Sequence, residues 1–252
     1  MHVSWQRIQT SERLVHAGGY ALCVREIIRG NKPAVLLVHG LGVSSEYYAA
    51  YAEQLAAHYS VYAVDLPGYG ASPKPPKALS IAGLSEVLIA LVAELKIEQC
   101  AVVGQSMGCQ IIAHALADRP ELFSKAVMIA PTVYVKERSV LMQGFRLFQD
   151  TFKESIDANS IVLKNYIKMR PFRFLATAKA MVRDSIDKSL EASDTELLFV
   201  VGSKDVIAPK AWADSLAART KRGTVRELNA PHLVHMQVPV ELARITHEFI
   251  GS

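Results

Sequence analysis

Short apolar runs alternate with longer amphipathic stretches along most of the chain. Several runs, such as residues 34–38 and 197–201, are apolar throughout, which is typical of strands buried on both faces of a sheet. Strands are therefore predicted over residues 20–28, 34–38, 61–64, 100–103, 125–130, 197–201 and 225–228.

Between these runs, apolar residues recur at helical spacing. Ile81, Leu84, Leu88 and Leu91, for example, share one face of a helix. Helices are predicted over residues 47–58, 81–95, 107–119, 209–218 and 240–250. Alternating strands and helices predict an α/β fold, a mostly parallel sheet with helices on both faces. Because ligands of such folds bind beyond the carboxyl ends of the strands, functional residues are expected just after strands.

One stretch, residues 131–194, breaks this alternation. It contains no convincing strand and is rich in helix formers and aromatic residues. A simple crossover needs far fewer residues, so a helical cap, or lid, is predicted over the carboxyl edge of the sheet. Residues 1–130 and 195–252 then form the core. The alternative is an ordinary pair of surface helices with no role in ligand binding.

Composition and charge exclude some classes of protein. The 252 residues, half of them hydrophobic, are enough for one large domain with a sizeable core. The net charge of +4 comes from scattered basic residues, with a modest concentration between Lys136 and Arg183, and not from the dense basic face of a nucleic-acid-binding protein. No apolar run is long enough to span a bilayer, and no signal peptide is visible. We therefore expect neither a nucleic-acid nor a membrane partner.

The cysteines indicate the compartment. Cys23, Cys100 and Cys109 are odd in number and form no C-x-x-C pair, which favours a reducing environment. A soluble, cytoplasmic protein is the expectation. No group of residues has the spacing of metal ligands, so no metal site is predicted.

Residues 104–108, Gly-Gln-Ser-Met-Gly, match the pattern G-x-S-x-G between a predicted strand and a predicted helix. A serine on so tight a turn needs glycine two positions away on each side, because side chains there would collide as strand and helix approach. The free N–H groups at the start of the helix favour negative charge next to the serine. Ser106 is therefore the candidate nucleophile.

A glycine-rich loop, His-Gly-Leu-Gly at residues 39–42, follows the strand at 34–38. Backbone N–H groups in such a loop can approach a substrate oxygen closely. The N–H groups of Leu41 and Met107 are predicted to form an oxyanion hole. His39 itself is interpreted as a structural histidine that hydrogen-bonds the loop.

A serine nucleophile needs a histidine base, and the base needs a carboxylate that orients it. His232 follows the strand at 225–228, and His235 is its close rival. Asp205 follows the strand at 197–201, whereas the loop after residues 125–130 contains no acid. Asp65 also ends a strand, but the proline and glycines after it favour a structural turn.

The order Ser106, Asp205, His232 resembles that of the α/β-hydrolase superfamily in its capped single-domain form. The motifs at residues 39–42, 65–72, 104–108, 202–205 and 231–239 fall in the family order. The resemblance implies the α/β-hydrolase fold with a helical cap inserted after the sixth core strand, and a Ser-His-Asp triad.

The sequence departs from the family pattern at two positions. Pro231 stands where many relatives have glycine, and Gln237 stands where many have an acid. Dehalogenase and epoxide-hydrolase relatives carry an aspartate at the position of Ser106, so the serine argues against both activities.

The resemblance implies acyl transfer, and the predicted substrate is an apolar carboxylic ester of small to medium size. No cofactor is expected, and the protein is expected to be a monomer or a homodimer. Three alternatives stay open: a carbon–carbon bond hydrolase; a thioesterase, lactonase or cofactor-free lyase; and a non-catalytic ligand receptor on the same scaffold.

Apolar side chains of the predicted cap are expected to form the substrate pocket. The residues assigned to it are Met142, Phe145, Phe148 and Phe172. Basic residues in the same segment leave open an anchor for a substrate carboxylate, and the candidates are Arg138, Arg146 and Arg173.

Overall fold

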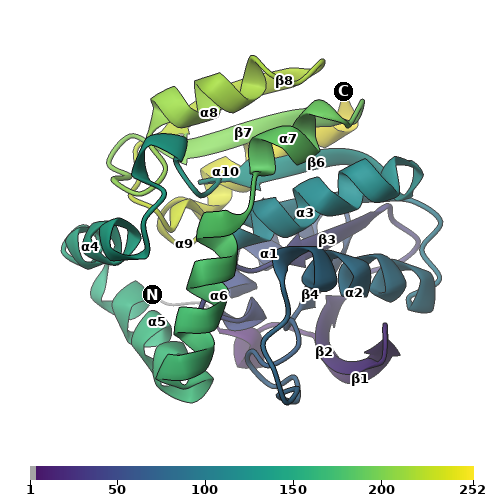
Figure 1. Cartoon of the computed structure of the whole chain (residues 1–252). Helices are drawn as coiled ribbons and strands as arrows, with labels where there is room; N and C mark the ends of the chain where they lie inside the picture. Colours follow the sequence, from purple (N-terminus) through teal and green to yellow (C-terminus); the bar gives the residue numbers. More distant parts are fainter. Residues whose placement is uncertain (1–3) are drawn as a thin grey trace.

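An eight-stranded sheet runs through the centre of the molecule in the computed structural model, which describes residues 4–252 (Figure 1). The strand order is β1-β2-β4-β3-β5-β6-β7-β8. Strand β2 is antiparallel to β1 and to β4, and all pairs from β4 to β8 are parallel. This confirms the mostly parallel sheet. The strands are β1 (Ser11–Ala17), β2 (Tyr20–Ile27), β3 (Ala34–Val38), β4 (Ser60–Val64), β5 (Cys100–Gln105), β6 (Phe123–Ile129), β7 (Glu196–Gly202) and β8 (Gly223–Leu228).

The central strands are apolar throughout because helices cover both of their faces. Every residue of β5 is buried, and β3 is buried apart from its first residue. Strand β3 lies between β4 and β5, so its backbone groups pair on both sides. Continuous burial of this kind requires the continuous apolar runs that identified these strands in the sequence.

Strand β1 was not predicted from the sequence. It lies at the edge of the sheet, and its residues are exposed except Val15 and Ala17, so it lacks the apolar run of a central strand. A two-residue turn, Gly18 and Gly19, joins it to β2, and both glycines have positive φ, 56° and 81°. Such a turn favours glycine and fixes the register of the hairpin.

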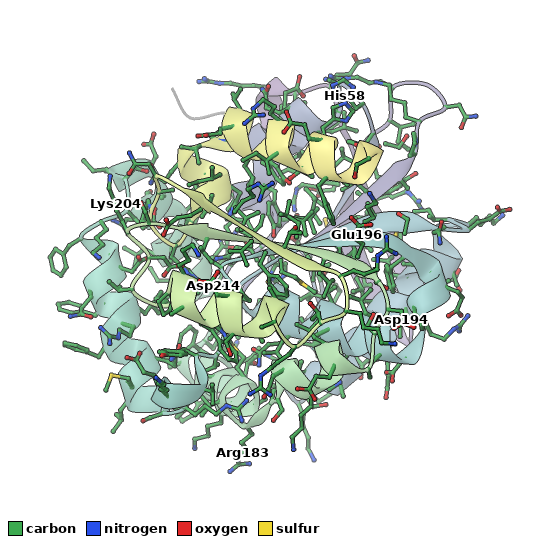
Figure 2. The ribbon with its side chains drawn as sticks, turned by 90° about the horizontal axis from the view of Figure 1, so that it is seen from above. His58, Arg183, Asp194, Glu196, Lys204 and Asp214 are labelled. Carbon is green, nitrogen blue, oxygen red and sulfur yellow. The ribbon has the colours of Figure 1, made fainter. Side chains whose placement is uncertain are left out.

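Helices cover the two faces of the sheet in separate layers. Helices α2 (Ile81–Glu94), α3 (Met107–Asp118), α7 (Ile186–Glu191) and α8 (Lys210–Ala217) contribute to one core, and α1 (Ala49–Leu55) and α10 (Pro239–Gly251) to the other. In Figure 2, α10 lies on one side of the sheet and α8, marked by Asp214, on the other, while Glu196 and Lys204 mark opposite ends of β7. The remaining short elements are η1 (Trp5–Arg7), η2 (Ser45–Tyr48), η3 (Pro120–Leu122), η4 (Val135–Glu137) and α9 (Val234–Gln237).

The segment between β6 and β7 is helical, with no strand among its described residues. It forms α4 (Val140–Thr151), α5 (Ile156–Met169), α6 (Pro171–Arg183) and then α7. Helices α4 and α5 lie to one side of the sheet layers (Figure 1). Helix α7 instead packs on α3, and its Ile186 and Leu190 belong to the core over the sheet. We refer to residues 131–183 as the helical insert, because α7 is the crossover helix that a parallel strand pair requires.

Within the described part of the chain, no helix is long and apolar enough to cross a membrane.

Candidate active site

Ser106 occupies the sharp turn between β5 and α3. Its backbone has φ 54° and ψ −115°, a conformation that costs a residue with a side chain about 1–3 kcal/mol. A Cβ atom on Gly108 would lie 2.2 Å from the carbonyl oxygen of Val38, and one on Gly104 would lie 2.7 Å from the carbonyl carbon of Gly108. Both glycines are therefore needed for strand and helix to approach closely around the serine.

Asp205 and His232 form a buried hydrogen-bonded pair. Nδ1 of His232 lies 2.8 Å from Oδ2 of Asp205, and the two side chains are almost completely buried. The other carboxylate oxygen, Oδ1, accepts hydrogen bonds from the N–H groups of Ile207 (2.7 Å) and Ala208 (3.0 Å). With Nδ1 donating to this fixed acceptor, Nε2 of the neutral imidazole is left as the proton acceptor.

The loops that carry this acid and base are locked together at the ends of β7 and β8. The N–H of Lys204 donates to the carbonyl oxygen of Ala230 at 3.0 Å. A Cβ atom on Gly202 would lie 2.2 Å from that same oxygen, so a larger residue would push the two loops apart. The geometry of the pair therefore depends on the backbone of both loops.

Burial and neighbouring charges act in opposite directions on the His232–Asp205 pair. Burial alone would lower the pKa of His232, but the charge and hydrogen bond of Asp205, with the nearby Asp150 and Glu154, hold that pKa above its ordinary value. Burial alone would raise the pKa of Asp205, but the charge and hydrogen bond of His232 and two backbone N–H groups hold it below its ordinary value. Both groups are thus stabilised in their charged forms.

A cavity of about 220 Å³ opens next to Ser106 and His232, and both residues line it. Within residues 4–252, the Oγ atom of Ser106 has one hydrogen-bond contact, 3.4 Å to Oγ1 of Thr132, and none to His232. Thr132 follows β6, in the loop whose sequence contains no acid. Nothing in the sequence indicates that its hydroxyl lies next to the candidate nucleophile.

The predicted oxyanion-hole residues lie on the two segments that border the serine. Leu41 follows β3 and lines the cavity. Met107 is the first residue of α3, and the N–H groups of a first helical turn have no partner within the helix. The assignment of these two N–H groups as oxyanion donors stays a prediction.

A buried side-chain network connects the glycine-rich loop to the histidine loop. The hydroxyl of Tyr47 accepts from the N–H of Gly40 at 2.9 Å and donates to Oε1 of Gln105 at 3.1 Å. Nε2 of Gln105 donates to the carbonyl oxygen of His232 at 3.5 Å. Gln105 precedes the serine in the G-x-S-x-G motif, where the pattern permits any residue, so nothing in the sequence indicates this role.

His235, the rival base, lies away from the cavity. It is fully buried between the rings of Tyr47 and Tyr48, with ring centroids 4.2 and 4.8 Å away. Neither ring nitrogen has a hydrogen-bond partner among the described residues, and burial lowers the pKa of His235 to about 3. A neutral imidazole enclosed by aromatic rings has no access to Ser106.

The residues interpreted as structural hold loops together. Nε2 of His39 accepts from the N–H of Leu66 at 3.0 Å, and its Nδ1 donates to the carbonyl oxygen of Gly40 at 2.8 Å. Asp65 is fully buried, accepts a hydrogen bond from the N–H of Ser45 at 2.7 Å and pairs with the guanidinium group of Arg25 at 3.1 Å. It does not line the cavity.

The side chains predicted to form the pocket are wrongly assigned. They do not line the cavity, and 40% to 89% of each is exposed; they are Met142, Phe145, Phe148 and Phe172. Helix α4 presents its other face, so that Val140, Gly144 and Leu147 border the cavity, and α6 contributes Phe174. Helix α4 is amphipathic, and its more apolar face, with Leu141, Phe145 and Phe148, is the exposed one. The usual expectation that the apolar face turns inward therefore fails for this helix.

The arginines that were left open as anchors for a substrate carboxylate have partners outside the cavity. Arg146 pairs with Glu137, and Arg138 lies 3.5 Å from a carboxylate oxygen of Asp187. Arg173 donates to backbone carbonyl groups of the loop after β4. None of the three lines the cavity.

No group of three or more His, Cys, Asp and Glu side chains is placed to hold a metal ion in residues 4–252. The arrangement that the structure does contain is a strained serine at a helix N-terminus, with a carboxylate-bound histidine at the same cavity. These groups are suited to nucleophilic attack on a carbonyl with proton transfer through the imidazole.

Residues 33–224 match the family model described as the alpha/beta hydrolase fold. This is about three quarters of the chain, and the chain belongs to the α/β-hydrolase family.

Two curated relatives show how far the similarity extends. A pimeloyl-[acyl-carrier protein] methyl ester esterase of Xanthomonas campestris pv. campestris (strain B100) is 25% identical over 255 residues, covering 88% of this chain and 97% of that protein. An uncharacterized protein of Mycobacterium bovis is 30% identical over 131 residues, but the match covers 52% of this chain and 37% of that protein's length.

Among solved structures, the enol-lactonase from Burkholderia xenovorans LB400 is similar along nearly its whole length. Its TM-score is 0.82 at 18% sequence identity, with 95% of this chain and 100% of that chain covered. At this identity, the similarity shows the fold alone.

Proposed function

We propose that this protein is a serine hydrolase that cleaves carboxylic esters of small to medium size. Ser106 is the nucleophile, His232 the base and Asp205 the acid that orients it. One observation carries the proposal: the carboxylate-bound His232 and the strained Ser106 line the same cavity. The relative named as a methyl ester esterase, which aligns along most of both chains, supports the choice of an ester.

The reaction follows from these positions. Ser106 attacks the ester carbonyl while Nε2 of His232 accepts its proton, and the charge of Asp205 stabilises the imidazolium that forms. The N–H groups of Leu41 and Met107 stabilise the oxyanion of the tetrahedral intermediate. His232 then protonates the departing alcohol, and water, activated by the same histidine, releases the acid from Ser106.

The helical insert serves as the lid of this site. The strand ends supply the reacting groups, and α4, α5 and α6 supply much of the cavity wall, including Leu147, Val162 and Phe174. A cavity of about 220 Å³ is small for a ligand site, since such sites commonly span roughly 300–1,000 Å³. The size favours short acyl groups over long chains.

A fluorophosphonate probe tests the proposal directly, because it labels only an activated serine. We expect labelling of the wild-type protein at Ser106, found by peptide mass spectrometry, and none in the Ser106→Ala protein. A panel of short aryl and alkyl esters, a thioester, a lactone and a vinylogous diketone then compares the proposed activity with its alternatives. Faster cleavage of the diketone than of every ester would favour a carbon–carbon bond hydrolase.

A further inference from the structure

Asp150 is a buried carboxylate that borders the cavity. It lies on α4, is 3% exposed, and its Oδ1 atom has no hydrogen-bond partner among the described residues. A buried carboxylate oxygen without a donor is costly, because desolvation is not compensated. Unlike the other buried acids of the site, Asp150 therefore lacks a hydrogen-bond donor for one of its carboxylate oxygens.

The other acidic groups near the cavity have their hydrogen-bond partners. Both oxygens of Asp205 accept hydrogen bonds, and so do both oxygens of Glu154, from the N–H of Leu233 at 2.7 Å and from Nε2 of Gln237 at 2.8 Å. The carboxylates of these two acids are thus occupied by hydrogen bonds to groups of the protein itself. Asp150 is the acid that lines the cavity with a carboxylate oxygen left without a partner among the described residues.

No lysine or arginine side chain lines this cavity in residues 4–252. Lys153, the nearest along the chain, donates instead to the carbonyl oxygen of Lys204 at 2.9 Å. Burial raises the pKa of Asp150, and the charge of Asp205 adds to this effect, while His232 opposes it. The cavity wall thus contains a carboxylate whose charge no lysine or arginine balances. Such a wall disfavours an anionic substrate and favours a substrate that carries a hydrogen-bond donor.

We propose that Asp150 recognises a hydrogen-bond donor on the substrate, an ammonium or hydroxyl group carried by the acyl part of the ester. The inference rests on the proposed ester hydrolysis and names its substrate class. The acyl part would lie in the cavity with its donor on the carboxylate of Asp150 and its carbonyl carbon at Ser106. Substrates with a carboxylate in the same place would be excluded.

Four ethyl esters with matched acyl groups test this proposal. Isovalerate, β-hydroxybutanoate and β-aminobutanoate differ only in a methyl, hydroxyl or ammonium group at one carbon, and 4-ethyl 2-methylsuccinate carries a carboxylate at that same carbon. For the wild-type protein we expect kcat/KM to be about tenfold or more higher for the ammonium ester than for the isovalerate, with the hydroxyl ester between them. The succinate should be the poorest substrate.

Asp150→Asn keeps the shape of the side chain and removes its charge. We expect the ratio of kcat/KM between the ammonium ester and the isovalerate to fall several-fold in this variant, because the amide oxygen can still accept a hydrogen bond but carries no charge. Asp157→Asn is the matched control, because Asp157 is an exposed carboxylate of α5 that does not line the cavity. It should leave all the ratios unchanged.

The same esters are also titrated by calorimetry into the Ser106→Ala protein, with and without Asp150→Asn. This separates the two proposals: an absence of turnover in the wild-type protein would count against ester hydrolysis, while a binding preference for the ammonium ester would still support the role of Asp150. The inference is overturned by a wild-type ratio near one, by a ratio that survives in Asp150→Asn, or by an equal loss for all four esters. The last result would instead make Asp150 a positioning residue for His232.

Discussion

Oε1 of Glu154 accepts a hydrogen bond of 2.7 Å from the N–H of Leu233, the residue directly after His232. The preceding residue, Lys153, binds the carbonyl oxygen of Lys204, directly before Asp205. Two consecutive residues at the junction of α4 and α5 therefore hold both loops of the acid–base pair. The helical insert therefore holds the loops of the acid–base pair through these two hydrogen bonds, in addition to forming part of the cavity wall.

Glu154→Ala should weaken both the fold and the reaction. It removes the acceptor for the partly buried N–H of Leu233, which costs about 1–3 kcal/mol in the free energy of unfolding, and it releases the histidine loop. Glu154→Gln is the control, since its amide oxygen can still accept from that N–H. Urea unfolding and kcat should show a clear loss for the alanine variant and a small one for the glutamine variant; equal losses would contradict this role.

The same glutamine variant should change how stability depends on pH. Burial raises the pKa of Glu154 from 4.5 to about 7 in the folded protein. Because the folded-state pKa is the higher one, the wild-type protein loses stability relative to Glu154→Gln as the pH rises between these values, by up to about 3 kcal/mol. Parallel stability curves for the two proteins across this range would rule out the raised pKa.

Replacing Ser106 should separate activity from stability. Ser106→Ala should lose turnover by about a million-fold, as triad variants do, and remain folded. Ser106→Gly should be equally inactive but more stable than the alanine variant, by about 1 kcal/mol, because glycine adopts a φ of 54° without strain. Thermal unfolding of the two variants checks this, and a less stable glycine variant would argue against strain at the turn.

Asp205→Asn should reduce kcat by about ten-thousand-fold and move the pH dependence of the remaining activity. The base works only when it is neutral, so activity should fall as the pH drops through the pKa of His232, which lies above 6.5 in the wild-type protein. Without the charge of Asp205 this acid limb should shift to lower pH. An unchanged limb in a pH series of kcat/KM would indicate that another group titrates.

Replacing His232 and replacing His235 should have opposite effects on the acylation of Ser106. His232→Ala should lose the acylation of Ser106 by an aryl ester, whereas His235→Phe should keep it, because the ring of His235 packs between tyrosines and bonds to nothing among the described residues. Burst kinetics on both variants measure this. An active His232→Ala protein with an inactive His235→Phe protein would reverse the assignment.

His235→Phe should also make the protein more resistant to acid. The pKa of His235 falls from 6.5 to about 3 on folding, so protonation favours the unfolded chain as the pH drops below 6.5. At about pH 5 the wild-type protein should have lost roughly 2 kcal/mol relative to the phenylalanine variant, compared with neutral pH. Denaturant unfolding at the two pH values gives the difference directly.

The fold could be predicted where burial imposes a periodic pattern. Strand β3 was predicted with its observed ends, Ala34 and Val38, because it is covered on both faces. Strand β1 was missed because an edge strand with one exposed face carries no continuous apolar run. The edge position is a property of the whole sheet and is not encoded within residues 11–17.

The candidate site could be predicted only where its groups follow strands in a fixed order. Ser106, Asp205 and His232 have that property, but Glu154 does not: it meets Leu233 across 79 positions of sequence, and it lies in the turn between α4 and α5. The prediction of the pocket residues failed for a related reason, since Phe145 and Leu147 are both apolar and lie on different faces of α4. Which face turns inward is decided by contacts with the rest of the molecule.

Strands β6 and β7 pair directly with each other, from Lys125 beside Glu196 to Ile129 beside Val200, although the helical insert separates them along the chain. The sheet is thus continuous without the insert, and another helical segment can occupy the same junction if it also replaces the contacts of Lys153 and Glu154 with the two loops. Over evolutionary time such exchange allows one chemistry to be inherited with many substrate ranges. Descendants of a common ancestor would then diverge most within residues 131–183 and least along the strands.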